Sequence, residues 1–240
     1  MSNIVIVGGS IEGLILSILC GKQHNVTLID IHPEIGFPCA IPGWVERRES
    51  LEKYLDDEEI AHLKFLQNPN GFALRGEWLF KILTIKAAQL GVRILLRCRV
   101  TKVEESSQQT TISTIGGNNT RDGIIICDKM FDLTEYTAPA PGKLQHTMID
   151  SPVQYASRQS FHHWGGIALS SEQQNTTVEP KLQLMRDDGL CEFWYDQKPT
   201  WQPKTGWIEQ MQNTIPKALE EMSIDNSIVY AESLFESLNH

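Results

Sequence analysis

Two glycines, a serine and an aspartate near the start of the chain have the types and spacing that suit dinucleotide binding. The segment reads IVIVGGSIEGLILSILCGKQHNVTLID, in which Gly8 and Gly13 follow one apolar run and Asp30 ends another. Gly8 allows a sharp turn from a strand into a helix, and Gly13 lets that helix pack closely against the strand. Ser10 stands where the usual pattern has a second glycine.

The residues around this turn could hold the parts of a nucleotide. Gly9, Ser10 and Ile11 lead into a helix whose unpaired N–H groups and positive dipole end suit a diphosphate. Asp30, with the adjoining Ile31, is placed to accept hydrogen bonds from the hydroxyls of an adenosine ribose. A carboxylate there disfavours a 2′-phosphate, so we do not expect a phosphorylated nicotinamide cofactor. The alternative is a doubly wound α/β protein with a glycine turn and no cofactor, and the whole unit favours nucleotide binding.

Apolar runs and turns predict the elements that position this site. Buried parallel strands are expected at Ile4–Val7, Val26–Ile29 and Val92–Leu96, with Met130–Thr134 returning to the same sheet, and helices at Leu14–Cys20 and Gly76–Leu90. Val100–Glu104, Thr110–Ile115 and Gly123–Cys127 predict an antiparallel meander. A nicotinamide-binding domain would have another helical crossover there, so a meander makes that class less expected.

The remaining segments predict one more helix, a turn and a second sheet. An amphipathic helix is expected over Ser50–Phe65, with the acidic run Asp56–Glu59 as its solvated face, followed by a turn at Asn68–Gly71. Alternating residues predict antiparallel strands within Ser160–Ser171 and Lys181–Asp196, and the spacing predicts a further helix over Trp207–Met222.

Composition limits the class of protein. The 240 residues suit one large or two small domains, and the net charge of −9 argues against a nucleic-acid partner. The five cysteines are odd in number and scattered, with no metal-ligand or CxxC spacing, so we expect a reducing cytoplasm and no metal site. The first residues do not read as a signal peptide, and no apolar run approaches a membrane span.

The order of VGGSIEGL, VTLID, PEIGFP, LRGEWLFKILTIKAAQLGV and the meander resembles the flavin-dependent group that contains p-hydroxybenzoate hydroxylase and the geranylgeranyl reductases. The resemblance implies a Rossmann-like FAD-binding domain, with a parallel sheet and a β-meander, at residues 1–135. It also implies a smaller, mostly antiparallel α+β lid domain at residues 136–240. PEIGFPCAIPGWV is similar to a loop near the flavin ring. The cofactor contacts that the resemblance implies outside the glycine turn are Gly36, Phe37, Pro38, Arg75, Val100 and Thr134.

Departures from the family leave two hypotheses open. The chain is short for the group, lacks any Gly-Asp dipeptide and has Glu135 in place of a glycine after MFDLT. One hypothesis is an FAD-dependent oxidoreductase of the reductase or monooxygenase type, with NADH as one option for the reductant. Trp44, Phe161, Trp164 and Trp194 suggest an apolar or aromatic small-molecule substrate. The other is a shortened, non-catalytic FAD- or ADP-binding relative, completed by a protein partner that supplies the missing flavin contacts.

Several further residues have a functional and a structural interpretation. Cys39 could be a thiol beside the flavin, although a small half-buried hydrophobe is favoured. His162 and His163 could donate protons to a substrate, but neighbours on a strand point to opposite faces, so at most one faces a pocket. Phe193, Trp194 and Tyr195 could line a cavity, with ordinary sheet core as the safer interpretation. Glu12 is an unusual residue so near phosphates and is expected to point to solvent. The sequence identifies no catalytic residue.

Overall fold

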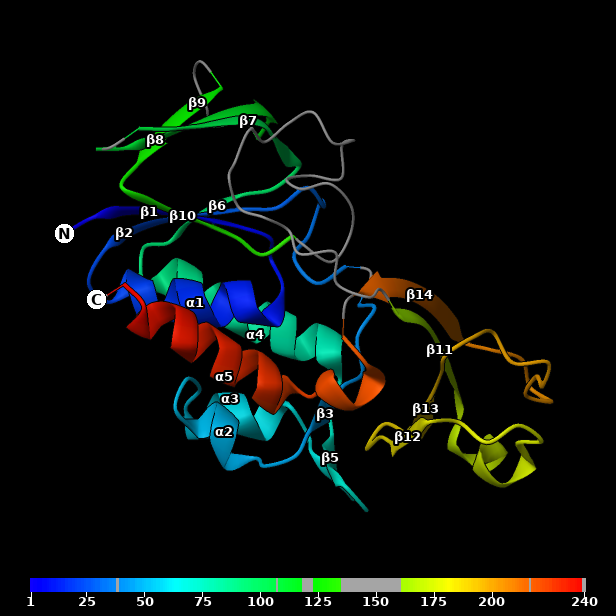
Figure 1. Cartoon of the computed structure of the whole chain (residues 1–240). Coiled ribbons are helices and arrows are strands. Elements are labelled where there is room, and N and C mark those ends of the chain that lie inside the picture. The colour runs from blue at the N-terminus through cyan, green and yellow to red at the C-terminus, as the bar shows by residue number, and fades with distance from the viewer. Residues whose placement is uncertain (38, 107, 118–122, 135–160, 216, 239–240) are drawn as a thin grey trace. The chain divides into compact units, whose positions relative to one another are not determined.

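A computed structural model of the chain describes residues 1–37, 39–106, 108–117, 123–134, 161–215 and 217–238 (Figure 1). The chain divides into two compact units, each built from separate stretches of sequence. The first unit comprises residues 1–37, 80–158 and 229–240, and the second comprises residues 38–79 and 159–228. None of the helices in the described ranges is long and apolar enough to span a bilayer.

The first unit is organised around a four-stranded parallel sheet. Its strand order is β10 (Lys129–Asp132), β1 (Asn3–Val7), β2 (Asn25–Ile29) and β6 (Arg93–Leu95). Helix α1 (Ile11–Gly21) and the part of α4 (Gly76–Gln89) that belongs to this unit lie on one side of the sheet (Figure 1). The antiparallel meander of β7 (Cys98–Glu105), β8 (Thr110–Gly116) and β9 (Ile124–Cys127) lies on the other.

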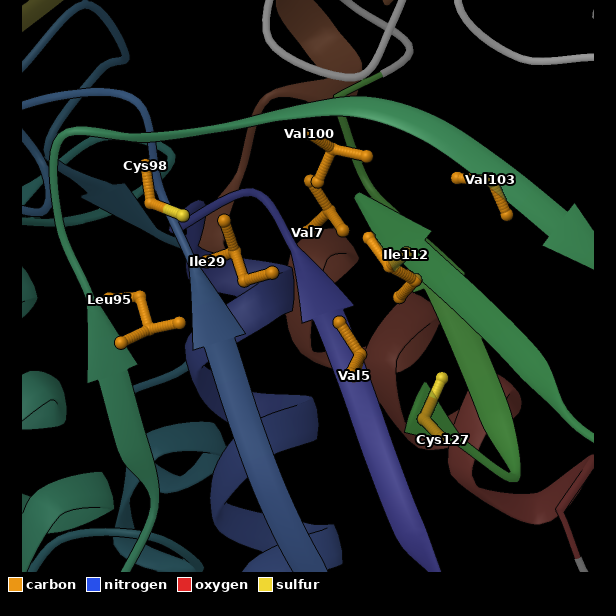
Figure 2. Packing of buried hydrophobic residues seen from close by; sticks show 9 residues of the cluster. All are labelled: Val5, Val7, Ile29, Leu95, Cys98, Val100, Val103, Ile112 and Cys127. Carbon is orange, nitrogen blue, oxygen red and sulfur yellow. The ribbon is translucent and has the colours of Figure 1, made fainter. Parts of the chain in front are cut away.

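The core between the parallel sheet and the meander is apolar and closely packed. Figure 2 shows the side chains of the sheet and of the meander pointing toward one another. The buried residues of this cluster are Val5, Val7, Ile29, Leu95, Cys98, Val100, Val103, Ile112 and Cys127. Burial of each aliphatic side chain contributes about 1.5–3 kcal/mol relative to exposure. This packing fixes the carboxyl ends of β1 and β2, from which the glycine turn and Asp30 project.

The second unit contains two antiparallel sheets. The larger has the order β12 (Leu182–Met185), β13 (Leu190–Tyr195), β11 (Phe161–Leu169) and β14 (Glu209–Ile215), and the smaller joins β3 (Trp44–Val45), β5 (Gly71–Ala73) and β4 (Leu66–Asn68). The unit also includes the short helices α2 (Glu49–Glu52), α3 (Asp57–His62), η1 (Ser170–Asn175) and η2 (Leu219–Glu221). Helix α5 (Ile224–Glu236) begins in this unit and ends in the first. The buried Asn68 side chain joins the two sheets through the N–H and C=O of Met185, at 2.9 and 3.0 Å.

The two faces of the larger sheet differ in character. One face gathers an aromatic cluster of Trp164, Phe193, Tyr195, Trp201 and Trp207. The strand register places His163, Gly165, Glu192, Trp194 and Asn213 on the opposite face. The alternation therefore separates the face that gathers the aromatic cluster from the face that carries the buried His163 and Glu192.

The coarse architecture expected from the sequence is confirmed. The chain has an α/β composition with a parallel sheet and separate antiparallel sheets, including the meander. The helix expected at Trp207–Met222 is wrong, because residues 209–215 instead pair with β11 as the strand β14. The single helix expected over Ser50–Phe65 is also wrong. Asp56 interrupts it as the N-cap of α3, and its side chain and that of Glu59 form a capping box rather than a simple solvated face.

The predicted division at residue 135 lies at the edge of a stretch, residues 135–160, outside the described residues. It stays a prediction about domains. Residues 38–79, which precede that boundary in sequence, belong to the second compact unit together with residues 159–228. Contacts such as the one between Asn68 and Met185 explain this grouping, because they join residues 117 positions apart.

Candidate functional site

The glycine turn at the end of β1 has the tight geometry that its sequence predicts. Gly8 has a φ of +110° and donates its N–H to the carbonyl of Ile29 at 2.8 Å. A Cβ at Gly8 would lie 3.2 Å from the backbone of Leu133 and from the Thr134 methyl group. A Cβ at Gly13 would collide with the carbonyl oxygen of Gly8. Both positions therefore require glycine, since any side chain would push α1 or the return of β10 away from the turn.

Asp30 is the buried polar centre of this turn. Its Oδ2 accepts a hydrogen bond from the Gly9 N–H at 2.6 Å, and its Oδ1 accepts one from the His32 N–H at 2.7 Å. The imidazole Nδ1 of His32 lies 2.9 Å from the same Oδ1. A carboxylate offers about four acceptor positions, so Asp30 retains capacity for a further donor. Sequence reasoning did not identify His32, although a histidine two residues after the acid could have indicated it.

The start of helix α1 presents backbone donors. Ser10 is its N-cap, and the Ser10 Oγ accepts a hydrogen bond from the Gly13 N–H at 3.2 Å. In the described part of the chain, the N–H groups of Ser10 and Ile11 have no hydrogen-bond partner. These donors and the positive end of the helix dipole suit an anionic oxygen. The serine that replaces the usual glycine thus stabilises the helix while its own N–H stays available.

Other residues predicted to bind cofactor lie near this turn. Thr134 follows β10, and both its N–H and its hydroxyl donate to Asp132 Oδ1, at 2.9 and 2.6 Å. The Val100 side chain is fully buried beside Val7 in the core, so only its backbone could meet a ligand. Ile31 is half-buried directly after Asp30. The structure brings these residues to one region of the first unit, and their contact with a cofactor stays a prediction.

The segment expected near a flavin ring begins with one constrained and one exposed residue. Gly36 has a φ of +75°, and a Cβ there would collide with the ring of Phe80. Phe37 is 62% exposed, and Pro38 lies outside the described residues.

Arg75 belongs to the second unit, where its Nε and Nη2 lie 2.8 and 2.7 Å from Glu77 Oε1. Its guanidinium also lies 4.7 Å from the centre of the Trp78 ring.

Arg75 is part of a charged network in the second unit that sequence reasoning missed. Arg186 is its buried centre, with Nη2 at 2.6 Å from Asp188 and 3.6 Å from Glu77. The other terminal nitrogen, Nη1, lies 3.3 Å from the buried Glu192. The network comprises Arg75, Glu77, Arg186, Asp188 and Glu192, two cations and three acids. The signal in the sequence was a glutamate inside the apolar run LCEFWY, where a charged residue would be buried.

Glu192 fixes a backbone segment as well as a cation. Its Oε2 accepts hydrogen bonds from the Gly43 N–H at 3.2 Å and from the Trp194 indole N–H at 3.1 Å. Burial raises the pKa of Glu192, and Arg186 together with these two donors opposes that shift. Burial alone would lower the pKa of Arg186, but its acidic neighbours, Glu192 foremost, outweigh burial and raise it. Glu192 therefore anchors Gly43 to the sheet, and the Asn213 amide holds the same segment through the carbonyl of Ala40 at 3.1 Å.

The remaining candidate residues lie in ordinary structural settings, with one exception. Burial, first of all, and the nearby acids raise the pKa of the Cys39 thiol to about 12, so the thiolate is scarce at neutral pH. Glu12 is 95% buried, contrary to the expectation that it points to solvent. His162 is exposed and His163 buried, on opposite faces of β11, as expected. Among the described residues, no group of three or more His, Cys, Asp or Glu side chains could hold a metal ion.

Comparison with known proteins shows similarity in fold. No family model and no curated protein matches the chain. The solved structure of p-nitrophenol 4-monooxygenase PnpA from Pseudomonas putida DLL-E4 aligns with 99% of this chain and 80% of its own, with a TM-score of 0.68 and 10% identity. Halogenase PltM, in complex with phloroglucinol and FAD, aligns with 99% of this chain and 69% of its own, with a TM-score of 0.61 and 11% identity. The chain therefore has a fold similar to that of a p-nitrophenol monooxygenase and of an FAD-binding halogenase.

Proposed function

We propose that this chain binds FAD and is an oxidoreductase of the monooxygenase or reductase type that acts on an apolar or aromatic small molecule. The observation that carries the proposal is the turn between β1 and α1. There, Gly8 leaves no room for a side chain, the N–H groups of Ser10 and Ile11 are available as donors, and the buried carboxylate of Asp30 accepts a hydrogen bond from the Gly9 N–H. The fold it shares with a monooxygenase and an FAD-binding halogenase supports the same assignment.

Each part of the turn has a role in holding the ADP portion. The N–H groups of Ser10 and Ile11 would bind the diphosphate, aided by the helix dipole. Asp30, held in place by Gly9 and His32, would accept hydrogen bonds from the ribose hydroxyls. When bound, the flavin supplies the redox chemistry with the substrate or with oxygen. The protein then binds and orients the two molecules and keeps water away, and no side chain has to act as a nucleophile.

A second candidate is a non-catalytic FAD- or ADP-binding protein that depends on a partner. The observation that favours it is Arg75, which the resemblance assigns to the cofactor but which is held at both Nε and Nη2 by Glu77. An arginine engaged in this way has less capacity for a phosphate or ribityl group. Under this hypothesis the adenosine site of the first unit remains and a partner supplies the flavin contacts.

The absorption spectrum of the purified protein with added FAD tests the proposal. We expect a bound yellow chromophore that bleaches with a chemical reductant and recovers in air. A protein that stays colourless with FAD but binds ADP would instead support the second candidate. If neither ligand binds, both assignments are wrong.

A pair of glycine variants localises the site. Gly8→Val should abolish FAD retention, because its side chain would meet Leu133 and Thr134 and fill the turn. Gly91→Val is the matched control, since Gly91 also has a positive φ, +83°, but a Cβ there meets nothing within 4 Å. Both variants carry the backbone strain of a branched residue at positive φ. Equal retention of FAD by the two variants would contradict the assignment to the β1–α1 turn.

A further inference from the structure

The carboxylate of Asp30 has most of its acceptor capacity in use. Its Oδ2 accepts a hydrogen bond from the Gly9 N–H at 2.6 Å. Its Oδ1 accepts one from the His32 N–H at 2.7 Å, and the ring nitrogen Nδ1 of His32 lies 2.9 Å from the same oxygen. Because an ionised carboxylate only accepts hydrogen bonds, Nδ1 must carry the proton and act as the donor. The three donors fill three of about four acceptor positions, and the remaining one is on Oδ2.

Backbone hydrogen bonds fix Asp30 and His32 independently of the imidazole ring. The Asp30 N–H donates to the carbonyl of Leu95 at 2.9 Å, and the Cys98 N–H donates to the carbonyl of Asp30 at 3.0 Å. The Arg97 N–H donates to the carbonyl of His32 at 3.0 Å. The ring thus adds one contact to a segment that its backbone already holds in place, so a substitution of the ring alone should leave this segment folded.

The ring of His32 can be removed or displaced more easily than the other two donors. The His32 side chain is 41% exposed, whereas that of Asp30 is 10% exposed. The Gly9 backbone, in contrast, runs directly against the carboxylate. A Cβ at Gly9 would lie 2.7 Å from Asp30 Oδ2 and 3.0 Å from the Ile35 side chain. The occupancy of Oδ1 therefore depends on the ring of His32.

We propose that His32 is a specificity-determining residue of this site, and that its ring takes the acceptor position of Asp30 that a second ribose hydroxyl would need. The proposal rests on the proposed function, since it concerns how the same site binds the ADP portion, and it narrows the role of Asp30 from two ribose hydroxyls to one. A ribose diol needs two acceptor positions, and Asp30 offers one. The site should therefore accept a nucleoside diphosphate that lacks one particular ribose hydroxyl nearly as well as one that has both.

ADP and its 2′-deoxy and 3′-deoxy analogues are the probes, and isothermal titration calorimetry measures their dissociation constants. In the parent, removal of the hydroxyl that binds Asp30 should weaken binding roughly 10- to 150-fold, the contribution of a hydrogen bond to a charged group. Removal of the other hydroxyl should change the affinity by less than about twofold, which is below the contribution of a neutral hydrogen bond.

Two substitutions of His32 test the role of the ring. His32→Ala opens the second acceptor position, while the backbone N–H of residue 32 can still bind Asp30. In this variant each deoxy analogue should bind roughly 10- to 150-fold more weakly than ADP, and ADP should bind more tightly than to the parent. In His32→Asn the amide nitrogen lies at the position of Nδ1 and can donate to Oδ1, so the pattern of the parent should return. His24→Ala is the matched control, since His24 Nδ1 accepts from the Ser2 N–H in the same unit.

Nitrogen NMR of the histidine-labelled parent gives a readout that needs no variant. The Nδ1 resonance of His32 should have the shift of a protonated ring nitrogen, both without ADP and at saturating ADP. A move of this resonance toward the shift of an unprotonated nitrogen would show that ADP displaces the ring from Asp30.

A parent whose affinity depends on both hydroxyls or on neither, a His32→Ala variant with the pattern of the parent, or displacement of the ring by ADP would each overturn the proposal. The flavin spectrum is recorded on the same preparations. Binding of ADP and FAD with equal dependence on both hydroxyls contradicts this inference alone, whereas failure to bind either ligand contradicts the proposed function.

Discussion

Replacement of Arg186 by methionine tests whether the buried charged network stabilises the second unit. Arg186 Nη1 lies 3.3 Å from Glu192, and the guanidinium is 97% buried. At that separation the attraction is about 5 kcal/mol for an effective dielectric constant of about 20. Removing one partner also leaves Glu192 buried without a counter-ion, and such changes cost about 3–5 kcal/mol. We therefore expect Arg186→Met to lower the free energy of unfolding by about 3–5 kcal/mol.

Urea unfolding followed by tryptophan fluorescence measures this change in the second unit. All six tryptophans, at positions 44, 78, 164, 194, 201 and 207, belong to the second unit. The double variant Arg186→Met/Glu192→Gln is the matched comparison. The glutamine oxygen can still accept from Gly43 and Trp194, but no charge remains buried. The double variant should thus be more stable than Arg186→Met alone.

Two results would refute this reasoning. A loss below about 1 kcal/mol in Arg186→Met would place the network among ordinary surface ion pairs. A double variant no more stable than Arg186→Met would show that the uncompensated charge of Glu192 is not the cause of the loss. In the second case, the lost hydrogen bonds from the guanidinium to Asp188 and Glu192 would be the better explanation.

Further predictions concern the cofactor, the helix cap, the thiols and pH. Asp30→Ala should weaken FAD binding roughly 10- to 150-fold, because a hydrogen bond to a charged group is lost. Titration of the protein with flavin measures this change. Asp128→Ala is the control: it removes a carboxylate that binds the Asn3 N–H in the same unit and should leave FAD binding unchanged. Asp56→Ala should lower the free energy of unfolding by about 0.5–2 kcal/mol through loss of the α3 cap, observed by tryptophan fluorescence; no change would mean that the cap is dispensable. At pH 8 the Cys39 thiol should react with a thiol reagent about a thousandfold more slowly in the native than in the denatured protein. The reason is that burial raises the pKa of the thiol from 9.0 to about 12. Equal rates in the two states would show that the Cys39 thiol is accessible. Burial raises the pKa of Glu192 above 4.5, so above pH 4.5 the folded state keeps a proton that the unfolded state loses. The contribution of Glu192 to the free energy of unfolding therefore falls as the pH rises above 4.5. In urea titrations above pH 4.5, Glu192→Gln should become more stable relative to the parent as the pH rises.

Local patterns predicted most of the first unit. The apolar run at Ile4–Val7 and the glycine turn are contiguous, Asp30 follows at the end of the next apolar run, and this strand–turn–helix–strand order follows from short-range rules. The meander was equally predictable from the sequence, because apolar and polar residues alternate along its strands and polar turns join them. The contacts of Asp30 with Gly9 and His32 could not be read in the same way, since they depend on how the ends of two strands meet.

The second unit was less predictable because its elements depend on distant partners. Residues 209–215 have helical spacing, but they form β14 because β11 offers an edge with which to pair. Arg186 precedes a polar turn in the sequence and looks like a surface residue, and its burial beside Glu192 depends on the pairing of β12 with β13.

The interleaving of the two units has a consequence for biosynthesis. Asn68 emerges from the ribosome 117 residues before Met185, the strand residue that its side chain binds. At about 5–20 residues per second, translation of that interval takes about 6–23 s. During this time the β4–β5 hairpin lacks the sheet that covers it, so nascent chains should be most vulnerable to proteases and most dependent on chaperones before β12 is made.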